Sequence, residues 1–129
     1  MNILFSRSNH TLEIKIYTDK TRSKEESTKI FDAYNNTTRD TKPWEPGTYE
    51  FCWHSPHKNE DENSSYGSNG NFIFNYTNRS GMGIHSGRKN KNGIKHVTKG
   101  CIRTSDEATL YHKNNLNKMY MACTLTVEE

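Results

Sequence analysis

The chain is poor in large aliphatic residues. Leu, Ile, Val and Phe together make up less than a fifth of its 129 residues, and the mean hydropathy is −1.07. Such a composition favours disorder when the net charge is also high. The net charge here is only +3, and aromatic residues supply 11% of the chain. We therefore predict one small folded domain spanning residues 1–129.

Signatures of several other protein classes are missing as well. No apolar run is long enough to span a membrane, and polar residues follow Met1–Phe5 at once, where a signal peptide would continue its apolar core. No cluster of Lys and Arg resembles a nucleic-acid-binding arm, and the charges from Arg88 to Lys95 are expected to lie on a solvated loop. We expect a monomer that neither spans a membrane nor binds nucleic acid.

The spacings typical of metal sites are also absent. The chain has neither a Cys-x-x-Cys nor a His-Glu-x-x-His pattern. A zinc site is therefore the weaker chemical alternative, and we expect neither a metal nor a cofactor. The candidate zinc ligands are Cys52, His54, His57, His85, His96, Cys101 and His112.

Cysteine is scarce, with only Cys52, Cys101 and Cys123 present. An odd number leaves at least one thiol unpaired. Cys52 and Cys123 either form a disulfide or are small buried thiols in strands. Both alternatives leave Cys101 free for chemistry.

What the chain does contain is a series of short β-strand patterns. Leu12, Ile14 and Ile16 alternate with polar residues, which is typical of a half-buried strand. Residues 3–18 predict two strands around a turn at 6–10. Further strands are expected at residues 29–34, 48–53, 71–76, 81–85 and 119–127, with a charged turn at 19–28 and a long polar loop at 54–70.

One helix is predicted near the C-terminus. Ser105 or Thr104 is expected to cap it, acidic residues occupy its first turn, and it should run to about Asn115. Three aromatic residues are candidates for a sugar or peptide groove, but we expect each to pack in the core. These are Trp44, Tyr49 and Trp53.

The stretch from Gly81 to Ala108 carries the candidate site. His85 lies between Gly83 and Gly87, and Cys101 follows a polar spacer. A thiolate is the nucleophile of cysteine chemistry, and a neighbouring imidazole is its usual base. The spacer can bring two short strands together and so place the two side chains side by side.

The residues around Cys101 fit the same chemistry. Gly100 permits a sharp turn with positive φ, which can aim successive backbone N–H groups at one point, as an oxyanion hole requires. Lys99 and Arg103 are expected to lower the pKa of the thiol and to bind a substrate carboxylate.

The segment His85-Ser86-Gly87, followed by Thr98-Lys99-Gly100-Cys101-Ile102-Arg103, resembles the catalytic domain of the L,D-transpeptidase (YkuD-like) family. The entry Pro46-Gly47-Thr48-Tyr49 to an upstream strand is also typical of that family. The resemblance implies a mainly β fold, a YkuD-like β-sandwich with one short capping helix after the nucleophile turn. Many members carry a histidine where this chain has Lys99, so a role for that second histidine is not carried over.

The resemblance assigns roles to the matching residues. Cys101 would be the nucleophile, His85 its base, and the N–H groups of Gly100 and Cys101 the oxyanion hole. Backbone near Ser86 and Gly87 would supply the carbonyl that orients the histidine. The expected substrate-binding residues are Thr98, Lys99, Arg103, Ser86 and Gly87.

The implied activity is cysteine-dependent acyl transfer on peptidoglycan stem peptides, as an L,D-transpeptidase, a D-amino-acid exchanger or an L,D-carboxypeptidase. The missing export signal suggests a delivered antibacterial toxin, or a piece of a longer precursor, that acts at the cell wall or in the periplasm. Such a toxin would have an immunity protein as a partner. The alternative is a non-catalytic cell-wall-binding module of the same fold.

Overall fold

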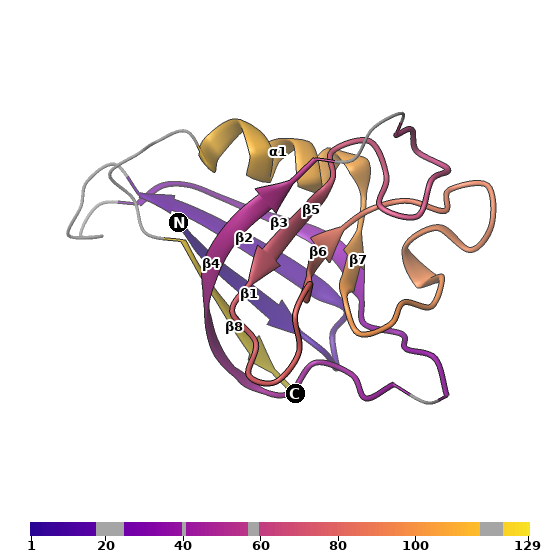
Figure 1. The fold of residues 1–129 in the computed structure, drawn as a ribbon. Coiled ribbons are helices and arrows are strands. Elements are labelled where there is room, and N and C mark those ends of the chain that lie inside the picture. The colour runs from indigo at the N-terminus through magenta and orange to yellow at the C-terminus, as the bar shows by residue number, and fades with distance from the viewer. Residues whose placement is uncertain (18–24, 40, 57–59, 117–122) are drawn as a thin grey trace.

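A computed structural model describes residues 1–17, 25–39, 41–56, 60–116 and 123–129. Its backbone is mainly β with one α-helix, as expected (Figure 1). The strands are β1 (Asn2–Ser6), β2 (Thr11–Tyr17), β3 (Glu25–Tyr34), β4 (Gly47–Ser55), β5 (Asn71–Phe74), β6 (Gly83–His85), β7 (Ile102–Thr104) and β8 (Thr124–Glu128).

The strands close into a barrel in the order β1-β2-β3-β7-β6-β5-β4-β8. Two neighbouring pairs are parallel, β1 with β8 and β6 with β7, and the other pairs are antiparallel. The closure differs from the two separate sheets of the expected sandwich. It arises because β8 pairs with β1 on one side and with β4 on the other, which leaves no free edge.

The opening hairpin follows its hydrophobic pattern. Leu12, Ile14 and Ile16 of β2 are each at most 1% exposed, so they point into the barrel, while the residues between them are half-buried. β1 places Ile3 and Phe5 beside them in the core. The predicted pair of strands is therefore confirmed.

Helix α1 (Asp106–Leu116) begins directly after β7. The Ser105 hydroxyl accepts a hydrogen bond from the Ala108 N–H at 3.1 Å, so Ser105 is the cap that the sequence suggested. The helix packs on the barrel through His112, whose ring stacks on Phe72 with centroids 4.2 Å apart, and through Tyr111, which lies 5.9 Å from Phe31. Its first turn thus stands next to the end of the strand that follows Cys101.

Several local expectations need correction. β3 starts at Glu25, so residues 25–28 are strand and not the predicted turn, because they pair with β2. The predicted long loop at 54–70 loses its first two residues to β4. Residues 18–24 and 119–122 lie outside the described residues, and from residue 123 onward the closing strand is Thr124–Glu128.

The three cysteines are all free thiols, so Cys52 and Cys123 form no disulfide. Cys52 is exposed, which also contradicts its expected burial, whereas Cys123 is half-buried and its Sγ lies 3.8 Å from His112 Nε2. Across the ranges that the structure describes, no helix is both long and apolar enough to cross a membrane.

Of the aromatic residues predicted to pack in the core, Trp44 does so and Trp53 does not. Trp44 is completely buried and packs edge-on against Tyr49 and Tyr76, as expected of a core residue. Tyr49 is half-buried and stacks on Tyr76. Trp53 is 52% exposed, so its predicted core position is wrong.

Candidate active site

The turn before β7 presents Cys101 in the conformation that glycine allows. Gly100 has a φ of +123°, and a Cβ at this position would clash with the Arg79 guanidinium and lie 2.8 Å from the Met82 sulfur. Buried Thr98 closes the turn, because its hydroxyl accepts from the Gly100 N–H at 3.1 Å and donates to the Cys101 carbonyl at 2.6 Å. Thr98 therefore shapes the site from behind.

The amide of Asn35 supports the same turn from β3's end. Its Nδ2 donates to the carbonyls of Gly100 at 2.8 Å and Cys101 at 3.0 Å. Its Oδ1 accepts from the Trp44 N–H at 2.6 Å. Asn35 lies far from the motif in sequence, and no local pattern marks it as part of the site.

Parallel pairing of β6 and β7 brings the cysteine and the histidine segments together. Ile84 pairs with Ile102, and His85 with Arg103. The Cys101 Sγ lies 3.4 Å from the Gly83 N–H nitrogen and 3.5 Å from the Gly81 carbonyl oxygen. Alternate residues of a strand share a face, so His85 lies on the same face of β6 as Gly83, and His85 and Cys101 line the same cavity.

His85 is 3% exposed and held by its neighbours. Its Nδ1 lies 2.8 Å from the Ser86 carbonyl, and its ring meets the Tyr66 ring edge-on at 4.8 Å. A carbonyl can only accept, so Nδ1 carries the proton and Nε2 is the basic nitrogen. The resemblance assigns the orienting carbonyl to this backbone segment.

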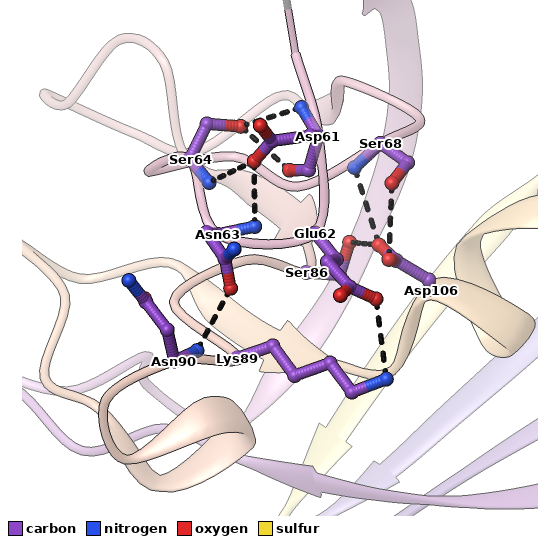
Figure 2. Close-up of polar contacts among 9 residues, drawn as sticks. All are labelled: Asp61, Glu62, Asn63, Ser64, Ser68, Ser86, Lys89, Asn90 and Asp106. Carbon is purple, nitrogen blue, oxygen red and sulfur yellow. Dashed lines mark hydrogen bonds and ion pairs between the residues drawn. The ribbon is translucent and has the colours of Figure 1, made fainter.

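A polar network anchors Ser86 (Figure 2). The Ser86 hydroxyl donates to Asp106, in the first turn of α1, and the same carboxylate accepts from the Ser68 N–H at 3.2 Å and the Ser68 hydroxyl at 3.0 Å. The Ser86 carbonyl that orients His85 is thus tied to the helix. Asp106 therefore holds the segment after His85 in place, whereas the sequence predicted only that it is an acidic residue in the first turn of the helix.

Several further contacts fasten the loop around residues 60–70 to the loop after His85, among them hydrogen bonds from the Arg88 and Lys89 N–H groups to the Ser64 and Glu62 carbonyls. The Asn63 side-chain oxygen accepts from the Asn90 N–H at 2.9 Å, and Lys89 pairs with Glu62 at 3.1 Å (Figure 2). Gly87 has a φ of +110°, and a Cβ there would clash with the Ser64 carbonyl. Gly87 therefore serves close backbone approach between the two loops.

Arg103 is 3% exposed and is used mainly inside the protein. It donates to four carbonyls: those of Ser86 (3.3 Å), His96 (2.8 Å), Val97 (3.2 Å) and Ser65 (2.9 Å). Burial lowers its pKa to about 10, so it remains charged at neutral pH. With four of its five N–H groups occupied, it joins the loop before β5 to the connection between β6 and β7 and has little capacity left for a carboxylate.

Burial raises the pKa of the Cys101 thiol above its usual value. Four groups act in the opposite direction: a hydrogen bond from the Gly83 N–H, the charges of Arg103 and Arg79, and a hydrogen bond from the Asn71 side chain. As expected, the charge of Arg103 lowers the pKa of Cys101. The effect of burial is larger, so the pKa is raised overall. At neutral pH the Cys101 side chain is therefore a thiol.

Cys101, His85 and Arg103 line one cavity of about 760 Å³. The other charged residues in its described wall are Arg79, Arg88 and Lys99, and none is an Asp or Glu. Arg88 adopts a φ of 57°, which is rare for a non-glycine residue, and donates to the Ser65 hydroxyl at 2.6 Å. Lys99 is exposed at the rim. The cavity wall is therefore strongly cationic.

His96 also lines this cavity, but its chemistry differs from that of His85. Burial, together with the charges of Arg103, Lys91 and Arg88, lowers the pKa of His96 below its usual value. It is therefore neutral at pH 7, and the cationic wall opposes its protonation. Among the described residues, no group of three or more His, Cys, Asp or Glu is arranged to hold a metal ion. The candidate ligand His57 lies outside the described residues.

Asn71 is the site residue with the clearest testable effect on the thiol. It is 3% exposed at the start of β5, and its Nδ2 also donates to the Gly81 carbonyl at 3.3 Å. Replacing it with alanine should raise the pKa of Cys101 further and slow Cys101 alkylation at neutral pH by roughly threefold or more. The difference should vanish at a pH above both pKa values. Peptide mapping of iodoacetamide labelling across pH measures this.

The matched control is Asn75→Ala, which removes an exposed amide at the end of the same strand. Its Cys101 labelling profile should overlay that of the wild type. A profile for Asn71→Ala that also overlays the wild type would show that the Asn71 amide does not stabilise the thiolate.

Comparisons with known proteins add no family assignment. A scan against protein-family models, a search of curated proteins and a search of solved structures each gave no match to this chain.

Proposed function

We propose that this protein is a cysteine acyltransferase acting on peptidoglycan stem peptides, as an L,D-transpeptidase, a D-amino-acid exchanger or an L,D-carboxypeptidase. The observation that supports it best is the pairing of β6 with β7. That pairing sets Cys101 Sγ against the Gly83 N–H in the cavity that His85 also lines, with His85 Nδ1 directed to the Ser86 carbonyl. A nucleophile, a base and an orienter of the base are the parts that covalent acyl transfer needs.

The first half-reaction forms a thioester. His85 Nε2 takes the proton from Cys101, and the sulfur attacks the carbonyl of the L-centre that precedes a terminal D-amino acid. The carbonyl oxygen becomes an oxyanion, which collapses as the C–N bond breaks. Protonated His85 gives its proton to the departing amine, so the D-amino acid leaves neutral at nitrogen.

The oxyanion would be bound chiefly by the Cys101 N–H. The Gly100 N–H, the other expected donor, points to the Thr98 hydroxyl, so a substrate oxygen must compete with that bond. In the second half-reaction, an amine or water attacks the thioester after His85 removes its proton. The sulfur leaves and is reprotonated, which gives a cross-link, an exchanged D-amino acid or a shortened peptide.

The charge of the cavity supports a carboxylate-bearing substrate. Arg79, Arg88 and Lys99 line it without a facing carboxylate, and within the described part of the chain none of them forms an ion pair. A tetrapeptide stem carries a free carboxylate on the very residue that leaves. Cationic walls would attract that end and hold the scissile carbonyl near the thiol.

The remaining elements of the proposal follow from the substrate. Peptidoglycan lies outside the cytoplasmic membrane, so the protein would act at the cell wall or in the periplasm as a delivered antibacterial effector with an immunity protein. The barrel would be a closed form of the YkuD-like β-sandwich, with α1 as the short capping helix.

One observation favours the alternative, a non-catalytic cell-wall-binding module. Burial raises the pKa of Cys101, which disfavours the thiolate in the resting protein. A binding module would hold the same cavity and ligand but would leave the bond intact. Product formation therefore separates the two functions.

The direct test is a mass-spectrometric digest. Purified disaccharide-tetrapeptide is incubated with the wild-type protein, with and without free D-methionine. We expect loss of the terminal D-alanine, or its exchange for D-methionine, and the product shows whether water or an amine is the acceptor. An unchanged tetrapeptide with a folded protein would contradict the proposed activity and leave the binding module.

A further inference from the structure

A second hollow of about 480 Å³ lies on the outer face of β4 and β5. Trp53 stands in its wall, with 52% of its surface exposed. The only other tryptophan, Trp44, is completely buried. An exposed indole that lines a hollow offers a flat apolar face and one N–H donor to a ligand.

A β-bulge explains why Trp53 faces outward. Phe51 pairs with Phe74 and Trp53 pairs with Ile73, so Cys52 is an extra residue that no partner opposes. In regular pleating Trp53 would share the inner face with Phe51. The extra residue shifts the alternation, so Trp53 points out while His54 turns in and stacks on Phe72 at 4.4 Å. The bulge thus redirects the indole to the surface.

This outer hollow adjoins the Cys101 cavity. Both are lined by Arg79, Ser80 and Gly81, the last turn before β6. The Gly81 carbonyl lies 3.5 Å from the Cys101 sulfur. A ligand that extends from the cavity into the Trp53 hollow therefore has to cross only the turn at residues 79–81.

The polar residues beside the indole define the ligand chemistry. Asn75, Thr77 and Ser80 are exposed, and among the described residues of the wall only Arg79 is charged; it donates to the carbonyls of Lys42 and Lys99. A flat aromatic face ringed by neutral hydrogen-bonding groups suits an uncharged ring whose C–H face packs on the indole and whose hydroxyl and amide groups bond at its edge. A pyranose sugar has that chemistry.

We propose that the Trp53 hollow binds a sugar ring of the glycan chain to which the stem peptide is attached. This inference rests on the proposed function, since it places the sugar and the peptide of one substrate in two adjoining sites. Stacking on Trp53 would contribute about tenfold to the selectivity for a substrate that carries its disaccharide over the same peptide without sugar.

Binding of sugar alone is tested without turnover. Cys101→Ala protein is titrated with the peptide-free disaccharide of N-acetylglucosamine and N-acetylmuramic acid, and tryptophan fluorescence is followed. Because Trp44 is buried, we expect a saturable change from Trp53 that is lost in the Cys101→Ala, Trp53→Phe double variant. The absence of a saturable change up to about 10 mM sugar would overturn the proposal and direct attention to a protein partner.

Selectivity is tested with two substrates. The ratio of kcat/KM for disaccharide-tetrapeptide over sugar-free tetrapeptide should fall from about ten in the wild type to about one in Trp53→Ala. The control Ile30→Ala, which removes an even more exposed apolar side chain from β3, should keep the ratio. An unchanged ratio in Trp53→Ala overturns the proposal. Saturable sugar binding without turnover of either substrate would instead reject the proposed function and retain the sugar site.

Discussion

Replacing Cys101 with alanine is expected to lower the release of D-alanine from the tetrapeptide by about 10⁴-fold or more. The sulfur is the only atom removed, and it makes the bonds that the mechanism requires. Without the sulfur no thioester forms. The only reaction left is direct attack by water, aided by the cationic wall and the N–H groups of the turn. Initial rates of D-alanine release, measured by mass spectrometry, report the loss.

The control is the exposed thiol of Cys52, which lies on β4 outside the cavity. Cys52→Ala should release D-alanine from sugar-free tetrapeptide at the wild-type rate, and the thermal unfolding of Cys101→Ala should match that of the wild type within a few degrees. Removing a nucleophile should lower the rate by roughly 100-fold at the very least. If Cys101→Ala keeps more than about one hundredth of the wild-type rate, another group performs the chemistry.

Replacing His85 with glutamine should lower the rate by about 10³-fold at neutral pH. Burial raises the pKa of Cys101, so the wild-type protein needs an acceptor for the thiol proton, and His85 Nε2 is the basic nitrogen on the same face. Glutamine keeps a polar side chain but cannot accept and return that proton. A pH series of initial rates measures the effect.

The pH dependence carries a definite sign. Below the raised pKa of Cys101, the thiolate fraction in His85→Gln grows about tenfold for each pH unit, so the deficit relative to the wild type should shrink as pH rises. His96→Gln is the matched control, since His96 lines the same cavity and is neutral at pH 7. A His96→Gln loss as large as that of His85→Gln would move the base to His96.

Local features of the fold could be predicted from the sequence because they depend on neighbours along the chain. The alternation of Leu12, Ile14 and Ile16 predicts β2, and Ser105 before two acidic residues predicts the start of α1. Closure of the barrel depends on parallel pairing between β1 and β8, the two ends of the chain. No periodicity within either strand specifies that partner.

The same distinction applies to the candidate site. The residues around His85 and Cys101 can be recognised in the sequence as a local motif. Gly100 belongs to that motif, and its φ of +123° explains why glycine stands there. Asn35, Asn71 and Asp106 reach the site from separate elements, so only tertiary structure reveals them. Arg103 sits in the motif, but only the tertiary structure shows that it donates to four carbonyls in two loops, which leaves it little capacity for the expected substrate carboxylate.

The bulge at Cys52 is a further feature that the sequence did not predict. Residues Phe51, Cys52 and Trp53 are all strand formers, and the alternating pattern predicts that Phe51 and Trp53 share the core face. The inserted residue is visible only in the pairing with β5, where it reverses the faces of everything after it. The exposed tryptophan, and the hollow beside the cavity, follow from that single shift.

The central claim is a thioester on Cys101, and an intact-mass measurement tests it most directly. Wild-type protein is mixed with excess tetrapeptide, quenched in acid within seconds and analysed whole, then digested to locate any adduct. The account predicts a mass increase equal to that of the tetrapeptide minus that of the released D-alanine, confined to the peptide that contains Cys101, and sensitive to hydroxylamine. Turnover without any adduct in wild type and His85→Gln, or an adduct on Cys52 or Cys123 instead, would contradict it.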